Sequence, residues 1–204
     1  MDYNNIKAII FDIDGVVFKS FDKEGNYLWS SSIEKDLGLT PKHLSLIFSY
    51  QWQDVVRGKV KLFDHLEIVF KKQSFQNLNV SPKEYVKYWL HKDHHVNKKL
   101  LKIVKELMAS CYIGTNQEEI RTLHILNSIN SYFKGCFASY QIGAIKPEVE
   151  FFQYIEKFLN IPANEILLID DSQENIVGAK DCGWNTFYYK NMDEFQRMVK
   201  KMKL

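Results

Sequence analysis

Short apolar runs alternate with amphipathic segments along much of this chain. The apolar runs predict strands over residues 7–12, 110–115, 136–140, 166–170 and 186–189. Between them, apolar positions recur at helical spacing and predict helices over residues 97–109, 117–131, 148–159 and 173–182. This order predicts a Rossmann-like α/β fold, in which helices cover both faces of a parallel sheet.

Residues 18–96 follow a different pattern. They predict helices over residues 26–37, 41–50, 61–72 and 82–92, and no segment has the pattern of a parallel strand. Two of these helices begin at Thr40-Pro41 and Ser81-Pro82, and a hydroxyl residue before proline is typical of a helix start. The stretch is too long for a simple crossover between strands. We therefore predict a helical cap domain at residues 18–96, inserted into a core domain of residues 1–17 and 97–204.

Composition and charge exclude several classes of protein. Of the 204 residues, 46% are hydrophobic and 25% are charged, which is ordinary for a globular protein. The net charge of +2 is too small to indicate a nucleic-acid partner. No apolar run reaches the ~18 residues of a membrane span, and no signal peptide is visible. The three cysteines lack metal-ligand spacing and favour reduced thiols and a cytoplasmic location: Cys111, Cys136 and Cys182.

Two predicted strands end in pairs of carboxylates. The run IKAIIFDIDGVV carries Asp12 and Asp14, followed at once by Gly15. The run ILLIDDS carries Asp170 and Asp171. Because the carboxyl ends of parallel strands meet at one edge of the sheet, we expect these acids to line one cleft. Carboxylates that meet repel one another unless a cation lies between them, and oxygen ligands favour Mg²⁺. Helix capping is the alternative, but it accounts for only one acid of each pair.

Two further segments offer groups that bind phosphate. The segment IGTNQ carries Thr115 and Asn116 after a strand, and the segment IKPE carries Lys146 before a proline. Taken alone, Thr115 is typical of a helix N-cap and Lys146 of a surface lysine. Phosphoryl transfer needs a nucleophile, positive charge around the phosphoryl oxygens and an acid for the leaving oxygen. The four segments together supply these parts.

In their order, the four segments resemble the motifs of the haloacid dehalogenase-like (HAD) hydrolase superfamily. The resemblance covers about residues 5–17 and 100–190, and residues 142–183 are especially similar to the sugar-phosphate phosphatase branch. The helical insert after the first motif resembles the class 1 cap of these enzymes. The resemblance implies an Mg²⁺-dependent phosphoric monoester hydrolase that works through an aspartyl-phosphate.

The same resemblance implies a role for each motif residue. Asp12 is the implied nucleophile and Asp14 the implied general acid and base. The implied metal ligands are Asp12, the backbone carbonyl of Asp14 and Asp171, with Asp170 acting through a water. The residues implied to bind the phosphoryl group are Thr115, Asn116 and Lys146, and Thr115 and Lys146 also count among the catalytic residues.

Two positions refine the comparison with this superfamily. Members that cleave carbon–halogen bonds lack an acid at the position of Asp14, so its presence disfavours a dehalogenase. Many members carry a second acid four residues after the metal-binding Asp171. Here that position is Asn175, which we expect to orient its neighbours only.

The predicted cap contains candidate substrate-binding residues. Trp52, Arg57 and Gly58 lie in an aromatic and basic stretch, and members of the superfamily often place a substrate-reading loop near such a glycine. We expect these residues to face the cleft. A packed tryptophan with solvated charges is an equally weighted alternative.

The segment HKDHH at residues 91–95 suggests a transition-metal site. His91 and His95 have a spacing that a helix would place on one face, with His94 beside them. No cysteine or third placed ligand accompanies them. We therefore expect a surface hinge between cap and core at these histidines.

The predicted activity is the hydrolysis of a small phosphorylated metabolite, with a sugar phosphate as the leading candidate and Mg²⁺ as the cofactor. A phosphomutase on the same core is one alternative, since it would return the phosphoryl group to the substrate. A non-catalytic binding protein is another, although a dead site would be free to lose its acids and its lysine. We expect no nucleic-acid or membrane partner, and a monomer or weak homodimer.

Overall fold

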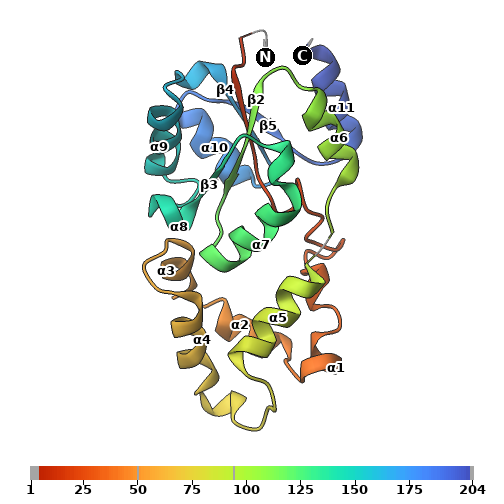
Figure 1. The fold of residues 1–204 in the computed structure, drawn as a ribbon, viewed down its shortest axis with the longest axis vertical. Helices are drawn as coiled ribbons and strands as arrows, with labels where there is room; N and C mark the ends of the chain where they lie inside the picture. Colours follow the sequence, from red (N-terminus) through yellow and green to blue (C-terminus); the bar gives the residue numbers. More distant parts are fainter. Residues whose placement is uncertain (1–4, 50, 94, 203–204) are drawn as a thin grey trace.

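A five-stranded parallel sheet forms the centre of the larger lobe of the molecule, here called the sheet lobe (Figure 1). The structure, a computed structural model, describes residues 5–49, 51–93 and 95–202. The strand order is β3-β2-β1-β4-β5, with β1 at Ala8–Phe11, β2 at Ser110–Thr115, β3 at Cys136–Ala138, β4 at Ile166–Asp170 and β5 at Asn185–Tyr188. The chain builds one side of the sheet through β3 and then crosses to the other side. Ligand sites of such sheets lie at the carboxyl ends of the strands where this change occurs, here between β1 and β4.

Alternating side chains of β1 divide the core of the sheet lobe in two. Ile9 and Phe11 pack on one face, which is covered by α6 (Lys98–Glu106), α7 (Glu119–Ile129) and α11 (Met192–Lys201). Ala8 and Ile10 pack on the other face, which is covered by α9 (Val149–Leu159) and α10 (Gln173–Asp181). Because both faces are buried, the central strand β1 is apolar throughout. The predicted Rossmann-like α/β fold is confirmed.

Most of the chain between β1 and α6, from about residue 19 onward, forms a smaller, helical lobe (Figure 1). Within the described residues its α-helices are α1 (Ile33–Leu37), α2 (Pro41–Ile47), α3 (Trp52–Val56), α4 (Leu62–Phe70) and α5 (Pro82–Lys92), with short 3₁₀ helices at Leu28–Ser30 and Gln73–Phe75. This lobe has an apolar cluster of its own, centred on buried residues such as Trp29, Leu66 and Tyr85. Pro41 and Pro82 open α2 and α5, as their helix-start pattern predicts.

The two connections between the lobes run side by side. Phe18 and Val96 form an antiparallel bridge, and Lys19 N donates a hydrogen bond to His95 O over 2.8 Å. Asn97 N donates to Val17 O, also over 2.8 Å. The predicted hinge segment around His95 therefore lies at this junction, while His94 lies outside the described residues.

Some element boundaries differ from the sequence expectation. The strand expected over residues 136–140 stops at Ala138, because α8 (Ser139–Ile142) begins there. The helix expected over residues 26–37 is broken into a 3₁₀ turn and α1 by three consecutive serines, which compete for backbone hydrogen bonds. Helix α3 was not expected, since its five residues are too few to show a helical period.

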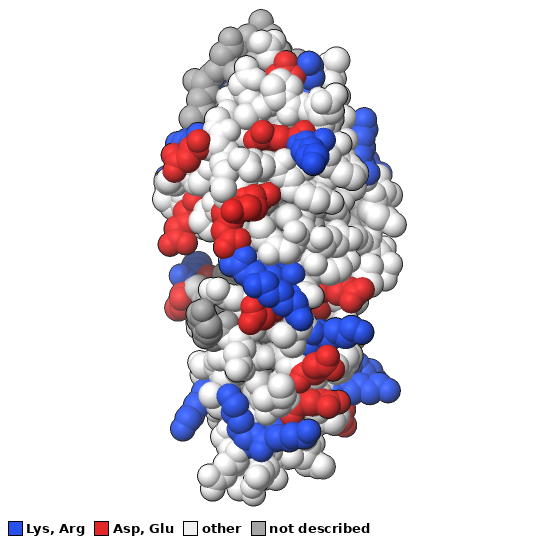
Figure 2. All heavy atoms as spheres, turned by 90° about the vertical axis from the view of Figure 1, so that its left-hand side faces the viewer, with Lys and Arg blue, Asp and Glu red and all other residues white. Residues whose placement is uncertain are grey.

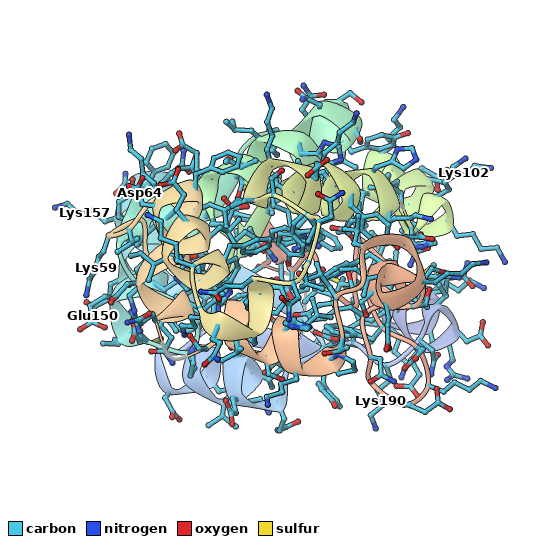
Figure 3. All side chains as sticks on the ribbon, turned by 90° about the horizontal axis from the view of Figure 1, so that it is seen from below. Lys59, Asp64, Lys102, Glu150, Lys157 and Lys190 are labelled. Atoms are coloured by element: carbon cyan, nitrogen blue, oxygen red, sulfur yellow. The ribbon has the colours of Figure 1, made fainter. Side chains whose placement is uncertain are left out.

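On one face of the molecule, charged groups are spread out rather than gathered into one patch (Figure 2). Figure 2 shows acidic and basic side chains interspersed over the face that carries α9 and α4. In the view from below, the labelled side chains lie at the periphery: Lys59, Asp64, Lys102, Glu150, Lys157 and Lys190 (Figure 3). No helix of the described chain is long and apolar enough to cross a membrane.

Candidate active site

The carboxyl ends of β1 and β4 bring three carboxylates together. The two strands are parallel neighbours with Phe11 opposite Ile169, so Asp12, which follows β1, comes beside Asp170 at the end of β4. Carboxylate oxygens of Asp12, Asp170 and Asp171 lie within 4.8 Å of one another. Within the described ranges this is the one cluster of potential metal ligands, and it contains no histidine. The predicted convergence of the first and fourth motifs is therefore observed.

Gly15 allows the first motif to pass close to this cluster. Its φ of +77° lies in the left-handed region that favours glycine. A Cβ atom at this position would lie 1.8 Å from Asp171 Oδ2, well inside contact distance. The position therefore requires glycine both for its backbone angle and for the approach to Asp171.

Lys146 is the cation at the centre of the acidic cluster. It is 2% exposed, and its Nζ donates to Asp12 Oδ1 over 2.8 Å, to Asp170 Oδ2 over 2.6 Å and to Gly114 O over 2.8 Å. Burial alone would lower the pKa of Lys146, but the charges of Asp12 and Asp170 outweigh burial and leave its pKa raised. Asn116 holds the backbone of Lys146 with two side-chain hydrogen bonds, of 2.9 Å to its carbonyl and 2.8 Å from its amide.

Asp170 has little capacity left for a direct ligand. It is fully buried, and besides Lys146 it accepts hydrogen bonds from Ser172 N over 2.8 Å and from Asn175 Nδ2 at 3.1 Å to each oxygen. Asn175 thus lies where an orienting group would act. Asp12 and Asp171, in contrast, both line the cavity described below.

The electrostatics of Asp12 and Asp171 fit a bound cation. Burial raises the pKa of Asp12 to about 8, with Lys146 opposing and Asp170 adding to the rise. Burial and the neighbouring Asp170 raise the pKa of Asp171 to about 6. A hard divalent cation between these oxygens would offset both burial and repulsion. The donor set, which is entirely carboxylate, suits Mg²⁺.

A cavity of about 180 Å³ opens beside the acids, and we call it the catalytic cavity. Its lining residues are Asp12, Asp14, Phe21, Thr115, Asn116, Gln117, Lys146, Asp171 and Asn175. Thr115 is the last residue of β2, and its Oγ1 is buried with no hydrogen-bond partner within the described chain. A buried hydroxyl without a partner is costly. An anionic oxygen of a ligand in this cavity would satisfy it.

Asp14 is held by a network that the sequence analysis did not anticipate. Arg121 donates from both terminal nitrogens, each over 2.7 Å, to the two oxygens of Asp14. Gln117 Nε2 donates over 2.6 Å, and the Ser20 hydroxyl donates as well. Burial alone would raise the pKa of Asp14, but the charge and hydrogen bonds of Arg121 outweigh burial and lower it.

Arg121 also joins the two lobes. Its Nε donates over 2.6 Å to Asp93, which lies just after α5 and is 2% exposed. Its guanidinium lies 5.7 Å from the ring centre of Trp89 on α5. Arg121 lies in the first turn of α7 and Gln117 lies two residues before the helix begins. Their separation of four residues could have indicated a shared face if the helix were taken to start at residue 117, as the sequence pattern predicts. The partner Asp93 could not be identified from spacing.

The three candidate residues of the cap lie in different places. Trp52 lines a cavity next to the catalytic one. Arg57 forms a two-pronged ion pair with Glu148, 2.6 Å long at Nη2, and so lies at the contact between the lobes. Gly58 lies against the backbone of Tyr140, where a Cβ atom would come within 2.3 Å of the carbonyl oxygen. Arg57 and Gly58 are absent from the lining of both cavities that include Asp14.

The sequence profile of the haloacid dehalogenase-like hydrolase family matches residues 6–183, a span that holds all four motifs and the helical insert. The chain belongs to the haloacid dehalogenase-like hydrolases. As a HAD hydrolase with relatives named as phosphatases, it is a phosphoric monoester hydrolase, and the predicted enzyme class is confirmed.

Relatives of this HAD hydrolase differ in their substrates. It is 26% identical over 185 residues to the sesquiterpene phosphatase astK of Aspergillus oryzae, which covers 87% of this chain and 86% of the relative. A stretch of 63 residues, 31% of each chain, is 35% identical to the D-ribitol-5-phosphate phosphatase of Bacteroides thetaiotaomicron. A HAD family enzyme of the same bacterium, solved as a magnesium complex, has a TM-score of 0.79 at 19% identity and covers 96% of this chain and 99% of its own. This last similarity shows the fold alone.

Proposed function

We propose that this HAD hydrolase is an Mg²⁺-dependent phosphatase that hydrolyses a small phosphorylated metabolite. One observation carries the proposal: Asp12, Thr115 and Lys146, from three separate segments, line one cavity. A carboxylate nucleophile, an unpaired hydroxyl and a buried ammonium group are the parts that a phosphoryl group needs.

The reaction proceeds in two displacements at phosphorus. A carboxylate oxygen of Asp12 forms a bond to phosphorus while the bond from phosphorus to the alcohol oxygen breaks, and the departing oxygen takes a proton from Asp14. A water then loses its proton to Asp14 and attacks the aspartyl-phosphate, which releases phosphate and restores Asp12. The first displacement therefore leaves Asp14 deprotonated, as the second needs it, and the second leaves it protonated again for the next substrate.

The surrounding residues prepare these steps. Lys146 and Thr115 hold phosphoryl oxygens, and Asn116 fixes Lys146 through its backbone. The negative charge of a bound phosphate opposes the effect of Arg121 and favours the proton on Asp14. Mg²⁺, held by Asp12, Asp171 and the carbonyl of Asp14, would neutralise charge between the nucleophile and the phosphate.

The motif resemblance and the names of two relatives both bear on the substrate. The motif resemblance favours a sugar phosphate, in agreement with the name of the ribitol-phosphate relative. The relative that covers most of the chain carries the name of a sesquiterpene phosphatase, whose substrates are hydrocarbon-rich. Both names are consistent with a phosphate ester of a small alcohol.

The proposal is tested by replacing the nucleophile. We expect Asp12→Asn to abolish Mg²⁺-dependent phosphate release from acetyl phosphate, because an amide does not attack phosphorus, while circular dichroism shows an intact fold. The matched control is Asp193→Asn, which changes an exposed aspartate on α11 and is expected to retain full activity. Undiminished turnover by purified Asp12→Asn would remove Asp12 from the mechanism.

A further inference from the structure

A second cavity of about 110 Å³ adjoins the catalytic cavity, and we call it the aromatic cavity. The two cavities share Asp14, Asn116 and Gln117 in their linings. The other lining residues are Arg121 and five aromatic residues of the helical lobe: Tyr27, Trp29, Phe48, Trp52 and Trp89. Since Asp14 lies at the boundary, an ester with its phosphoryl group in the catalytic cavity would place its alcohol part here.

The five rings form a continuous apolar wall. They come from three separate parts of the helical lobe, yet neighbouring ring centres lie only 4.9–6.3 Å apart. These are ordinary distances for rings in contact. Burial raises the pKa of Tyr27 to about 12, with the charge of Asp14 adding to the rise, while part of the Tyr27 ring stays exposed.

The side-chain donors on the opposite side of the aromatic cavity each have a partner within the described chain. Asn116 Nδ2 donates to the carbonyl of Lys146, and Gln117 Nε2 donates to Asp14. All three nitrogens of the Arg121 guanidinium donate to carboxylates, although each amide nitrogen and each terminal guanidinium nitrogen keeps a second N–H. A polyol would therefore find hydrogen bonds on this side of the cavity only, because the faces of the five rings offer none, whereas a hydrocarbon needs none.

One polar group of the wall has no partner within the described chain, namely Trp89 Nε1. This nitrogen is buried, as Thr115 Oγ1 is, and it could offer a bound alcohol a single hydrogen bond. One such donor beside five rings leaves the wall predominantly apolar.

An aromatic wall can also bind a quaternary ammonium group. Here the guanidinium of Arg121 already lies over the ring of Trp89, 5.7 Å from its centre. This ring face is therefore already occupied by a cation, whose own charge is offset by Asp14 and Asp93. The observations thus favour a neutral hydrocarbon over a choline-like group.

We propose that the substrate is the monophosphate of a small apolar alcohol, such as a short isoprenoid or arylalkyl alcohol. This inference rests on the proposed phosphatase function and specifies its substrate class. The volume of the cavity sets the size, because an apolar cavity of about 150 Å³ accommodates benzene. At about 110 Å³, the aromatic cavity holds about five carbons.

The test compares three esters of similar size. Phosphate release is measured from dimethylallyl monophosphate, erythritol 4-phosphate and phosphocholine, with acetyl phosphate as a reference that has almost no alcohol part. We expect kcat/KM for dimethylallyl monophosphate to exceed that of the other two esters at least tenfold. Preference for erythritol 4-phosphate or phosphocholine, with acetyl phosphate still hydrolysed, would overturn the apolar substrate class and leave the phosphatase function standing.

Matched variants locate this preference in the aromatic cavity. Tyr27→Ser and Phe63→Ser both remove a partly exposed ring from the helical lobe, at 38% exposure each, but only Tyr27 lines the aromatic cavity. We expect Tyr27→Ser to lower the ratio of dimethylallyl to erythritol ester turnover at least threefold, and Phe63→Ser to leave the ratio unchanged. Equal ratios in both variants would show that the wall does not select the substrate.

A binding measurement keeps the inference testable without turnover. Three of the four tryptophans of the chain line the aromatic cavity: Trp29, Trp52 and Trp89. Titration with 4-methylpent-3-enylphosphonate, which cannot be hydrolysed, is expected to change tryptophan fluorescence in a saturable way, and the erythritol ester is expected to change it far less. If no ester were hydrolysed, the phosphatase function would fail, and the absence of a fluorescence change would separately reject the apolar cavity.

Discussion

Replacement of Arg121 by methionine tests how much this buried cation, which lies between the two lobes, contributes to the stability of the protein. Arg121 is 2% exposed and joins Asp14 and Asp93 through three hydrogen bonds of 2.6–2.7 Å. The methionine side chain is unbranched like that of arginine and fills part of the same space, but it carries no charge. After the change, Asp14 keeps donors from Gln117 and Ser20, whereas the Asp93 carboxylate loses its hydrogen-bond partner within the described chain, the Nε of Arg121.

The magnitude follows from the burial of the two carboxylates. Removing one member of a buried ion pair costs about 3–5 kcal/mol, because the remaining charge stays buried without compensation. We expect this loss of unfolding free energy for Arg121→Met. Asp93→Asn should cost less, about 1–3 kcal/mol, because Arg121 keeps both hydrogen bonds to Asp14. The double variant Asp93→Leu with Arg121→Met should lose less than the sum of its single changes.

Unfolding in guanidinium chloride without Mg²⁺, followed by circular dichroism and fluorescence, measures these differences. Arg197→Met is the matched control, because Arg197 is an exposed arginine on α11, and its cost should stay within about 0.5 kcal/mol. A loss below about 1 kcal/mol for Arg121→Met, or strict additivity in the double variant, would refute the reasoning.

Two further predictions concern backbone and thiols. Gly15→Ala should abolish Mg²⁺-dependent phosphate release, because its Cβ would displace Asp171, whereas Gly25→Ala at a φ of +84° meets no atom within 4 Å and should cost only about 1–2 kcal/mol of stability with activity intact. Equal activity losses in the two alanine variants would contradict this account. Burial raises the pKa of Cys111 and Cys136 to about 12 and also raises that of Cys182. At pH 8 Cys111 and Cys136 of the folded protein should therefore react at least about a hundredfold more slowly with Ellman's reagent than in the unfolded protein, which should release three equivalents. Rapid release of more than one equivalent from the folded protein would argue against this account.

The sheet and its acidic edge could be predicted from the sequence because their signals are local. An apolar run that ends in Asp12 and another that ends in Asp170 identify two buried strands and their functional ends. Once the strands are parallel, the convergence of these ends with Lys146 follows from topology. The roles of the individual residues stay predictions that the variants above test.

The setting of Asp14 could not be predicted because it depends on contacts between distant segments. Arg121 has the pattern of a surface residue on a helix, and only the packing of α5 against α7 brings Asp93 to it. The same reason explains Arg57, whose basic character suggested a substrate contact but whose partner is Glu148, 91 residues away. The partner of a side chain on the helical lobe depends on how the two lobes pack together. The local spacing of apolar and polar residues carries no information about that packing.

The paired connections between the lobes determine how the molecule can open. Phe18 and Val96 pair in an antiparallel bridge where the two connections between the lobes run side by side. If the helical lobe rotated about an axis through this pair, each atom would move in proportion to its distance from the axis. Ser20 and Asp93 lie within three residues of the axis and shift little, so Asp14 and Arg121 keep their partners. At the far edge, the ion pair between Arg57 and Glu148 would have to break before the helical lobe could rotate away from the sheet lobe. Such a rotation would admit an ester at the far edge while the hydrogen bonds that hold Asp14 stay in place.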